Sequence, residues 1–160
     1  MTRTSDLQIT TPSDTEIEIS RSFAAPRHLV FDAFTKPELI KRWLLGPPGW
    51  TMPVCEVDLR VGGQYRYVWR HEVSKQEMGL GGEYREIDAP AHLVATEQFE
   101  QPWYPGIGVG TFRFVEKNGR TFVTQTMMYE SKEIRDQVAK SGMDSGVGAS
   151  YDRLADILES

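Results

Sequence analysis

The sequence predicts an α+β domain, with a curved antiparallel sheet of about six to seven strands and a long C-terminal helix. Three observations carry this prediction. Short runs of alternating polar and apolar residues fill most of the chain between residues 54 and 129, and no long helical segment separates them. Two short helical segments follow the first expected strand. Residues 142–158 have the apolar spacing of a helix with one buried face.

Length and composition indicate one globular domain. Residues 1–13 are polar and are expected to form a flexible N-terminal tail before a single domain of residues 14–160. The net charge of −5 argues against nucleic-acid binding and against electrostatic attachment to a membrane. The start does not resemble a signal peptide, and no apolar run approaches the ~18 residues of a membrane span. A cytoplasmic protein without membrane insertion is expected.

The first elements are expected to be a strand and two short helices. Polar and apolar residues alternate over residues 16–23, as in a half-buried strand. Pro26 suits the first position of a helix, so a short helix is expected over residues 28–34. A second short helix is expected over residues 38–44, and the glycine and proline residues at positions 46–49 end it.

The middle of the chain is expected to be an antiparallel meander. The dipeptide Asn118-Gly119 lies between two alternating runs, which is a hairpin signal. Tyr65, Tyr67 and Trp69 alternate with polar residues and share one face of their strand. The expected strands are residues 54–59, 64–70, 83–87, 93–99, 111–116 and 120–129. A short helix is expected at residues 131–138.

The last helix carries small residues on or beside its buried face. On a helical wheel, Met143, Val147 and Tyr151 share that face, Ser150 lies within it and Gly146 lies at its edge. A glycine inside a helix costs ~1 kcal/mol relative to alanine. The small residues therefore indicate either open volume between helix and sheet or close packing of the two. The residues alone leave both interpretations open.

No group of residues has the spacing of a catalytic or metal site. The histidines are isolated in the sequence, and Cys55 is expected to be a small buried apolar residue. The glycines of residues 106–110 are followed by an expected strand, so they predict a loop and not a dinucleotide site. No catalytic residue, metal or cofactor is expected. Whether the protein is an enzyme stays open, and the balance is against it.

Five motifs in the same order resemble a known family. They are FAAPRHLVFDAFTKPELIKRWL, GP-x-GW, VDLRVGGQYRY, GEYREIDAPAHLVAT and GMDSGVGASYDRLADIL. Together, over residues 15–158, the chain resembles the activator of heat-shock protein 90 ATPase homologue family. That family is part of the START-like (SRPBCC) superfamily, which includes polyketide cyclases.

The resemblance implies a helix-grip fold, in which the sheet wraps around the C-terminal helix and leaves an elongated apolar cavity. It implies that a small hydrophobic or aromatic molecule, lipid-like or polyketide-like, binds in this cavity. The residues expected to line the site are Trp43, Trp50, Tyr65, Tyr67, Trp69, Phe112, Phe114, Met143, Gly146, Val147, Ser150 and Tyr151.

Two other functions stay open. The first is an enzyme of the cyclase, aromatase or hydrolase kind, which would need polar groups in the cavity such as Arg113, Glu97 or Tyr84. The second is a stress-response role in which the protein stimulates the ATPase of a heat-shock protein 90 partner. The co-chaperone that gives the family its name resembles a two-domain protein, and only the START-like domain is expected in this sequence. A homodimer also stays open.

Overall fold

The computed structural model describes residues 5–159 and contains one antiparallel sheet in the order β1-β2-β8-β7-β6-β5-β4-β3. The strands are β1 (Gln8–Ser13), β2 (Glu16–Phe23), β3 (Trp50–Val57), β4 (Gln64–His71), β5 (Glu77–Asp88), β6 (His92–Phe99), β7 (Gly108–Lys117) and β8 (Arg120–Met128). The helices are α1 (Arg27–Thr35), α2 (Pro37–Trp43), α3 (Lys132–Ala139) and α4 (Met143–Glu159). The pairing of β2 with β8 joins the β1–β2 hairpin to the meander β3–β8.

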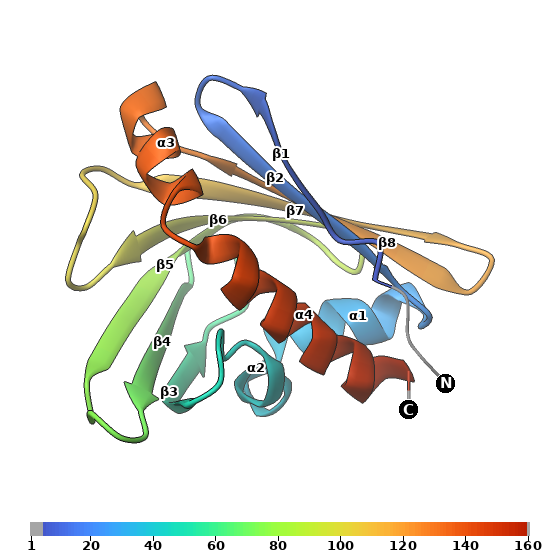
Figure 1. The fold of residues 1–160 in the computed structure, drawn as a ribbon. Coiled ribbons are helices and arrows are strands. Elements are labelled where there is room, and N and C mark those ends of the chain that lie inside the picture. Colours follow the sequence, from blue (N-terminus) through green and yellow to red (C-terminus); the bar gives the residue numbers. More distant parts are fainter. Residues whose placement is uncertain (1–4, 160) are drawn as a thin grey trace.

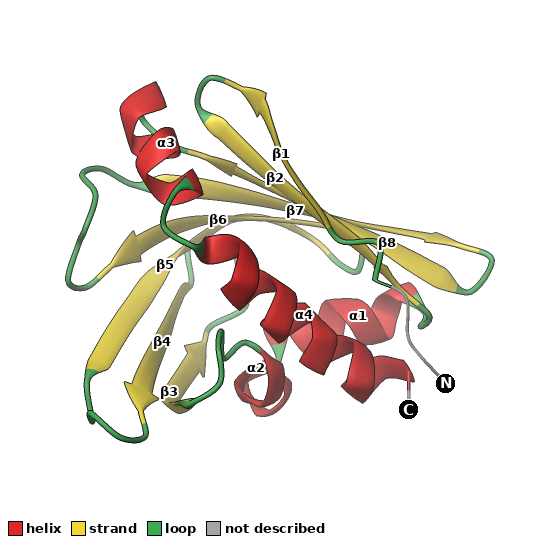
Figure 2. Ribbon diagram, in the orientation of Figure 1, coloured by secondary structure: helices red, strands yellow, loops and turns green. Residues whose placement is uncertain are grey.

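The helix α4 crosses the concave side of the sheet (Figure 1). The short helices α1 and α2 connect β2 to β3 and contact α4 (Figure 2). The class predicted from the sequence, a curved antiparallel sheet around a C-terminal helix with two short helices after the first predicted strand, is confirmed. The described residues form eight strands, somewhat more than the six to seven expected.

The C-terminal half of α4 is fixed by aromatic contacts. Four residues of this half are 3% exposed or less: Ser150, Tyr151, Leu154 and Ala155. The Tyr151 ring lies 5.8 Å from the rings of Phe23 and Trp43 and 6.2 Å from that of Phe34, measured between centroids. The pairs with Phe23 and Phe34 are edge-on and the pair with Trp43 is tilted, and aromatic pairs stabilise by about 0.5–1.5 kcal/mol each beyond the burial of area. The cluster attaches α4 to β2, α1 and α2 at one end of the sheet.

The sheet bends where β5 meets β6. A methyl group at Gly82 would overlap the carbonyl oxygen of Thr96 on β6, so the two backbones approach closely here. The Glu83 amide donates to the Thr96 side-chain hydroxyl at 2.8 Å, and the Thr96 carbonyl accepts from the Tyr65 hydroxyl at 2.6 Å. Side chains thus replace part of the usual strand ladder. Figure 1 shows β3, β4 and β5 turned relative to β6, β7 and β8.

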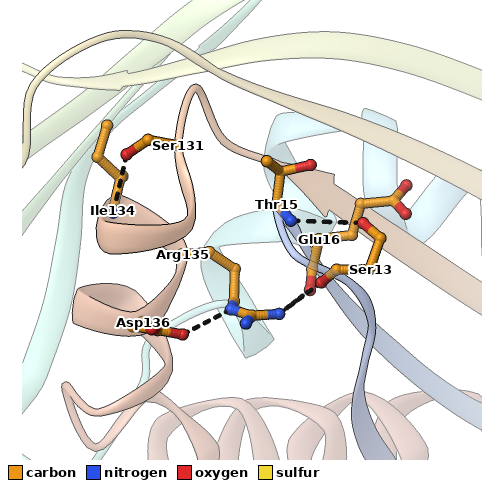
Figure 3. A network of polar contacts seen from close by, with 7 residues as sticks. All are labelled: Ser13, Thr15, Glu16, Ser131, Ile134, Arg135 and Asp136. Carbon is orange, nitrogen blue, oxygen red and sulfur yellow. Dashed lines mark hydrogen bonds and ion pairs between the residues drawn. The ribbon is translucent and has the colours of Figure 1, made fainter.

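The helix α3 is attached to the β1–β2 turn through Arg135 (Figure 3). The Arg135 guanidinium is buried, and its Nη1 donates to the Ser13 carbonyl at 2.5 Å while its Nε donates to Asp136 at 2.9 Å. Ser131 caps the helix by accepting from the Ile134 amide at 3.2 Å. These contacts fix α3 just before the chain enters α4.

Several sequence expectations differ from the structure. The expected strands at residues 54–59 and 111–116 begin earlier, at Trp50 and Gly108, so residues 108–110 belong to β7 and not to a loop.

The flexible tail predicted for residues 1–13 is wrong for Gln8–Ser13, which pairs with β2 as an edge strand; residues 1–4 lie outside the described residues. The side chains of β1 are mostly exposed, so pairing of its backbone with β2, and not an apolar face, holds this strand in place. Its sequence therefore lacks the alternation of polar and apolar residues that would have predicted a strand. The strand expected at residues 83–87 begins at Glu77 in the structure. The prediction missed the first half of this strand because glycine, which occurs there three times, has weak strand propensity.

Gly82→Ala is expected to lower the free energy of unfolding by at least about 2 kcal/mol, because the new methyl group would force β5 and β6 apart. Gly146→Ala is the matched control. Its methyl group would lie 3.5 Å from Cδ of Pro47, an ordinary contact, and alanine favours a helix by about 1 kcal/mol. Urea unfolding followed by circular dichroism measures both variants. Wild-type stability in Gly82→Ala would contradict the close approach of the strands.

Candidate functional site

A cavity of about 480 Å³ lies between the sheet and α4. Thirteen aromatic residues line it, including all four tryptophans of the chain. The volume lies within the range of about 300–1,000 Å³ that is usual for small-molecule sites. Of the twelve residues predicted to line a ligand site, eleven line this cavity. Their contact with a ligand stays a prediction.

The helix side of the cavity is formed by the predicted residues of α4, namely Met143, Gly146, Val147, Ser150 and Tyr151. The Ser150 hydroxyl accepts a hydrogen bond of 2.9 Å from the Gly46 amide, so the loop after α2 is joined to α4 here. A Cβ at Gly146 would point to the same loop, 3.5 Å from Pro47. The small residues of α4 therefore both border the cavity and let this loop approach the helix.

The sheet side includes the aromatic face of β4. The rings of Tyr65 and Tyr67 lie 5.0 Å apart, and those of Tyr67 and Trp69 lie 5.9 Å apart, in one row along the cavity wall. The Trp69 indole nitrogen donates to the Leu44 carbonyl at 2.7 Å. The Tyr65 hydroxyl is likewise bonded to the Thr96 carbonyl. Because their polar atoms are bonded in this way, the side chains of Trp69 and Tyr65 offer the cavity mainly apolar surface.

Trp43 and Trp50 line the cavity from α2 and from the start of β3. Trp43 is 1% exposed, and its indole nitrogen donates to the Ala33 carbonyl at 2.8 Å. Trp50 is partly exposed and lies edge-on to His71, with ring centroids 5.1 Å apart. Trp43 is therefore a rigid wall residue, whereas Trp50 lies where the cavity approaches the surface.

Phe112 and Phe114 lie on the same face of β7 but have different surroundings. Phe112 lines the cavity. Phe114 does not line it: this ring is 1% exposed and lies 5.4 Å from both Phe31 and Phe34. The prediction that Phe114 is a wall residue is wrong, because this ring packs in the core against Phe31 and Phe34 of α1, whereas Phe34 itself borders the cavity.

The segment between β6 and β7 supplies cavity residues that the sequence reading missed. Trp103 and Tyr104 line the cavity, but neither was among the residues predicted to line a ligand site. The Gln137 side chain donates to the Trp103 carbonyl at 2.6 Å, and Glu130 accepts from the Ile107 amide at 2.8 Å. The only sequence signal was a pair of adjacent aromatic residues within a polar segment.

Glu97 is the single charged residue among the described residues that line the cavity. It lies deep in the protein and still keeps an intermediate exposed area, because it borders the cavity. Burial raises the pKa of Glu97 to about 7. The Tyr104 hydroxyl opposes this rise in pKa, although that buried hydroxyl makes no hydrogen bond of full geometry. Within residues 5–159, no salt bridge to Glu97 is present.

The other polar groups considered for chemistry are less suited to it. Tyr84 lines the cavity, and burial raises its pKa well above the ordinary value. Arg113 is exposed on β7 and does not line the cavity, so it is not one of the converging polar groups. Burial raises the pKa of Cys55 to about 11, which makes its thiolate scarce at neutral pH. Over residues 5–159, no three His, Cys, Asp or Glu residues gather as metal ligands would.

A curved sheet that wraps around a C-terminal helix and encloses an apolar cavity defines a helix-grip domain. A family model described as "Activator of Hsp90 ATPase homolog 1-like protein" matches residues 24–159, and the chain belongs to this family. No match was found among curated proteins. Across the described part of the chain, no helix is both long and apolar enough to cross a membrane.

Solved structures with the same fold come from several organisms. A protein of Rhodobacter sphaeroides is 29% identical, with a TM-score of 0.89 over 96% of this chain and 97% of that chain. An Hsp90 activator of Plasmodium falciparum is 20% identical, with a TM-score of 0.58 over 84% and 91% of the two chains. CalU16 of Micromonospora echinospora is 20% identical, with a TM-score of 0.61 over 97% and 85%. The last two likenesses concern the fold alone.

Glu97→Gln is expected to stabilise the protein at pH 8 but not at pH 4. The pKa of Glu97 is raised from 4.5 to about 7 on folding, so the folded protein binds this proton more tightly than the unfolded chain. The free energy of unfolding therefore falls as the pH rises through this window, and a neutral amide avoids that loss. The variant should gain about 3 kcal/mol over the wild type by pH 8.

Urea unfolding of both proteins at several pH values measures this difference. Glu56→Gln, at an exposed position of β3, is the control and should show no such trend. A constant difference between Glu97→Gln and the wild type from pH 4 to pH 8 would contradict the raised pKa.

Proposed function

We propose that this protein binds a small hydrophobic or aromatic ligand in the cavity between the sheet and α4. The observation that carries the proposal is the volume of about 480 Å³ with its largely aromatic wall. A wall of this kind gains free energy by covering apolar ligand surface, at about 25 cal/mol per Å² removed from water. The helix-grip fold of the family is a ligand-binding fold, which supports the same conclusion.

The polar groups around the cavity are few and mostly occupied. The indole nitrogens of Trp43 and Trp69 and the Tyr65 hydroxyl are bonded to backbone carbonyls. These rings therefore offer a ligand their faces while their polar atoms stay satisfied. A ligand that is mainly apolar, with few hydrogen-bonding groups, suits such a wall best.

The proposed entrance lies between α4 and the loop after α2. Pro47 is exposed, and Trp50, Met143, Gly146 and Val147 are partly exposed while they also line the cavity. The hydrogen bond from Gly46 to Ser150 crosses this same region. Opening it would widen a path to the cavity without disturbing the aromatic contacts of Tyr151.

A second candidate is acid–base catalysis on a ligand held in the same cavity, of the cyclase or hydrolase kind. It is supported by Glu97, whose pKa of about 7 suits proton transfer near neutral pH, and by the adjacent Tyr104 hydroxyl. Within the cavity wall no second carboxylate accompanies Glu97. Turnover that disappears in Glu97→Gln while binding persists would favour this candidate over simple binding.

A third candidate is the stimulation of a heat-shock protein 90 ATPase. It is supported by the family and by the fold shared with the Plasmodium falciparum activator. Measuring the ATPase rate at saturating protein decides it, and an unchanged rate removes it. A cytoplasmic location and a homodimer remain predictions from the sequence.

The neutral fluorescent probe N-phenylnaphthylamine is expected to bind the wild type with a Kd on the order of 1–100 µM and to quench tryptophan fluorescence. Ala95→Phe should weaken this binding at least about tenfold, because Ala95 lines the cavity and the larger ring fills it. Val115→Phe, at an exposed position of β7, adds a ring outside the cavity and should leave binding unchanged.

Circular dichroism verifies that both variants are folded. The proposal fails if the wild type binds neither this probe nor a panel of lipids and polyketides, or if the two phenylalanine variants weaken binding equally.

A further inference from the structure

The carboxyl group of Glu97 is out of place in a purely apolar pocket. It is the only charged side chain among the described residues of the wall, and no salt bridge within residues 5–159 neutralises it. Transfer of an unpaired carboxylate from water into such surroundings is costly. A glutamine or an apolar residue would avoid this cost. We therefore expect the ligand itself to supply the group that compensates the charge of the Glu97 carboxylate.

Aromatic rings from three parts of the chain surround this carboxyl. Burial raises the pKa of the phenols of Tyr65 on β4, Tyr104 in the β6–β7 segment and Tyr129 after β8, and the nearby charge of Glu97 raises each of them further. The rings of Tyr104 and Tyr129 are perpendicular, with centroids 5.7 Å apart. We call Glu97, Tyr65, Tyr104 and Tyr129 the acidic end of the cavity.

One polar atom of the acidic end is only weakly engaged, because the Tyr104 hydroxyl interacts with Glu97 without a well-formed hydrogen bond. The Tyr104 side chain is 5% exposed, and its hydroxyl oxygen makes no hydrogen bond of full geometry. The Tyr65 hydroxyl, by contrast, is used by the Thr96 carbonyl. The acidic end thus has a carboxyl without a counter-charge, beside a hydroxyl that is only weakly bonded to it, and both lie on the wall of one cavity.

We propose that the ligand carries a protonated amine, which pairs with the Glu97 carboxylate at the acidic end while the apolar body of the ligand fills the rest of the cavity. This inference rests on the proposed function, because it specifies the chemistry of a ligand bound at that site. An ammonium group supplies the missing counter-charge, and the surrounding ring faces attract it through cation–π interactions. The Tyr104 hydroxyl can donate to the second carboxylate oxygen.

A neutral hydroxyl on the ligand would suit the acidic end less well. It could donate one hydrogen bond to Glu97, but it would leave the negative charge uncompensated in an apolar wall. An anionic ligand would place two like charges together. The net charge of the chain, −5, also favours the approach of a cation over that of an anion.

Binding of an amine should depend on the ionisation of Glu97 alone. The groups that face it are the phenols of Tyr65, Tyr104 and Tyr129, whose pKa values are raised and which stay neutral below pH 8. Because burial raises the pKa of Glu97 to about 7, affinity for an amine should rise with pH up to that value and then level. Below it, each amine that binds should displace about one proton.

The experiment compares tryptamine with tryptophol, which differ in the replacement of an ammonium by a hydroxyl. Each competes with N-phenylnaphthylamine on the wild type, on Glu97→Gln and on the surface control Glu56→Gln at pH 8. Tryptamine should bind the wild type and the control at least about tenfold more tightly than tryptophol. In Glu97→Gln that preference should disappear, while tryptophol binds within about twofold of the wild type.

Calorimetry on the wild type gives a test that needs no variant. At pH 6, in buffers that differ in their heat of ionisation, tryptamine should release about one proton on binding and tryptophol none. Equal affinities for the two ligands, an unchanged preference in Glu97→Gln, or no proton release overturns the amine assignment and leaves hydrophobic binding standing. If the wild type binds neither N-phenylnaphthylamine nor any member of the panel of lipids and polyketides, both proposals are overturned.

Discussion

The attachment of α4 through the Tyr151 ring is the contact on which the rest of the structure depends. Tyr151 contacts Phe23 of β2, Phe34 of α1 and Trp43 of α2, so one side chain joins the helix to three elements at one end of the sheet. At the other end the helix begins with small or flexible residues and approaches a loop instead of the strands. Because α4 packs against the strands through large side chains only in its second half, a cavity remains between its first half and the sheet.

The second requirement for that volume is the bend of the sheet, and it is met by backbone geometry. At Gly82 the strands β5 and β6 approach too closely for any side chain, and Thr96 replaces ladder contacts with bonds to Glu83 and Tyr65. The same bend brings Tyr65 across from Glu97, because the two residues lie on β4 and β6 on either side of β5. The bend that curves the sheet thus also places Tyr65 near Glu97, the charged residue of the cavity wall.

The sequence predicted most of the fold and most of the wall, for identifiable reasons. The alternation of Tyr65, Tyr67 and Trp69 and the wheel of α4 both express a local period, and local periods are visible in a single chain. Three features were not predictable in this way. The edge strand β1 depends on backbone pairing with β2, the neighbours of Phe114 depend on where α1 folds back, and Trp103 with Tyr104 depend on a loop fixed by α3. Each is set by contacts between distant residues, which leave no pattern in the local sequence.

The close approach of β5 and β6 at Gly82 means that the shape of the cavity and the chemistry of its inner surface are set by different parts of the structure. The shape of the container is fixed by a backbone contact that tolerates no side chain, whereas its inner surface is made of side chains that project from an already determined frame. Exchanging an aromatic wall residue that does not hold α4, such as Tyr67, leaves this frame in place. Selectivity can therefore drift during evolution, or be redesigned in the laboratory, without a new architecture, and descendants of one ancestral chain can come to hold chemically unrelated molecules.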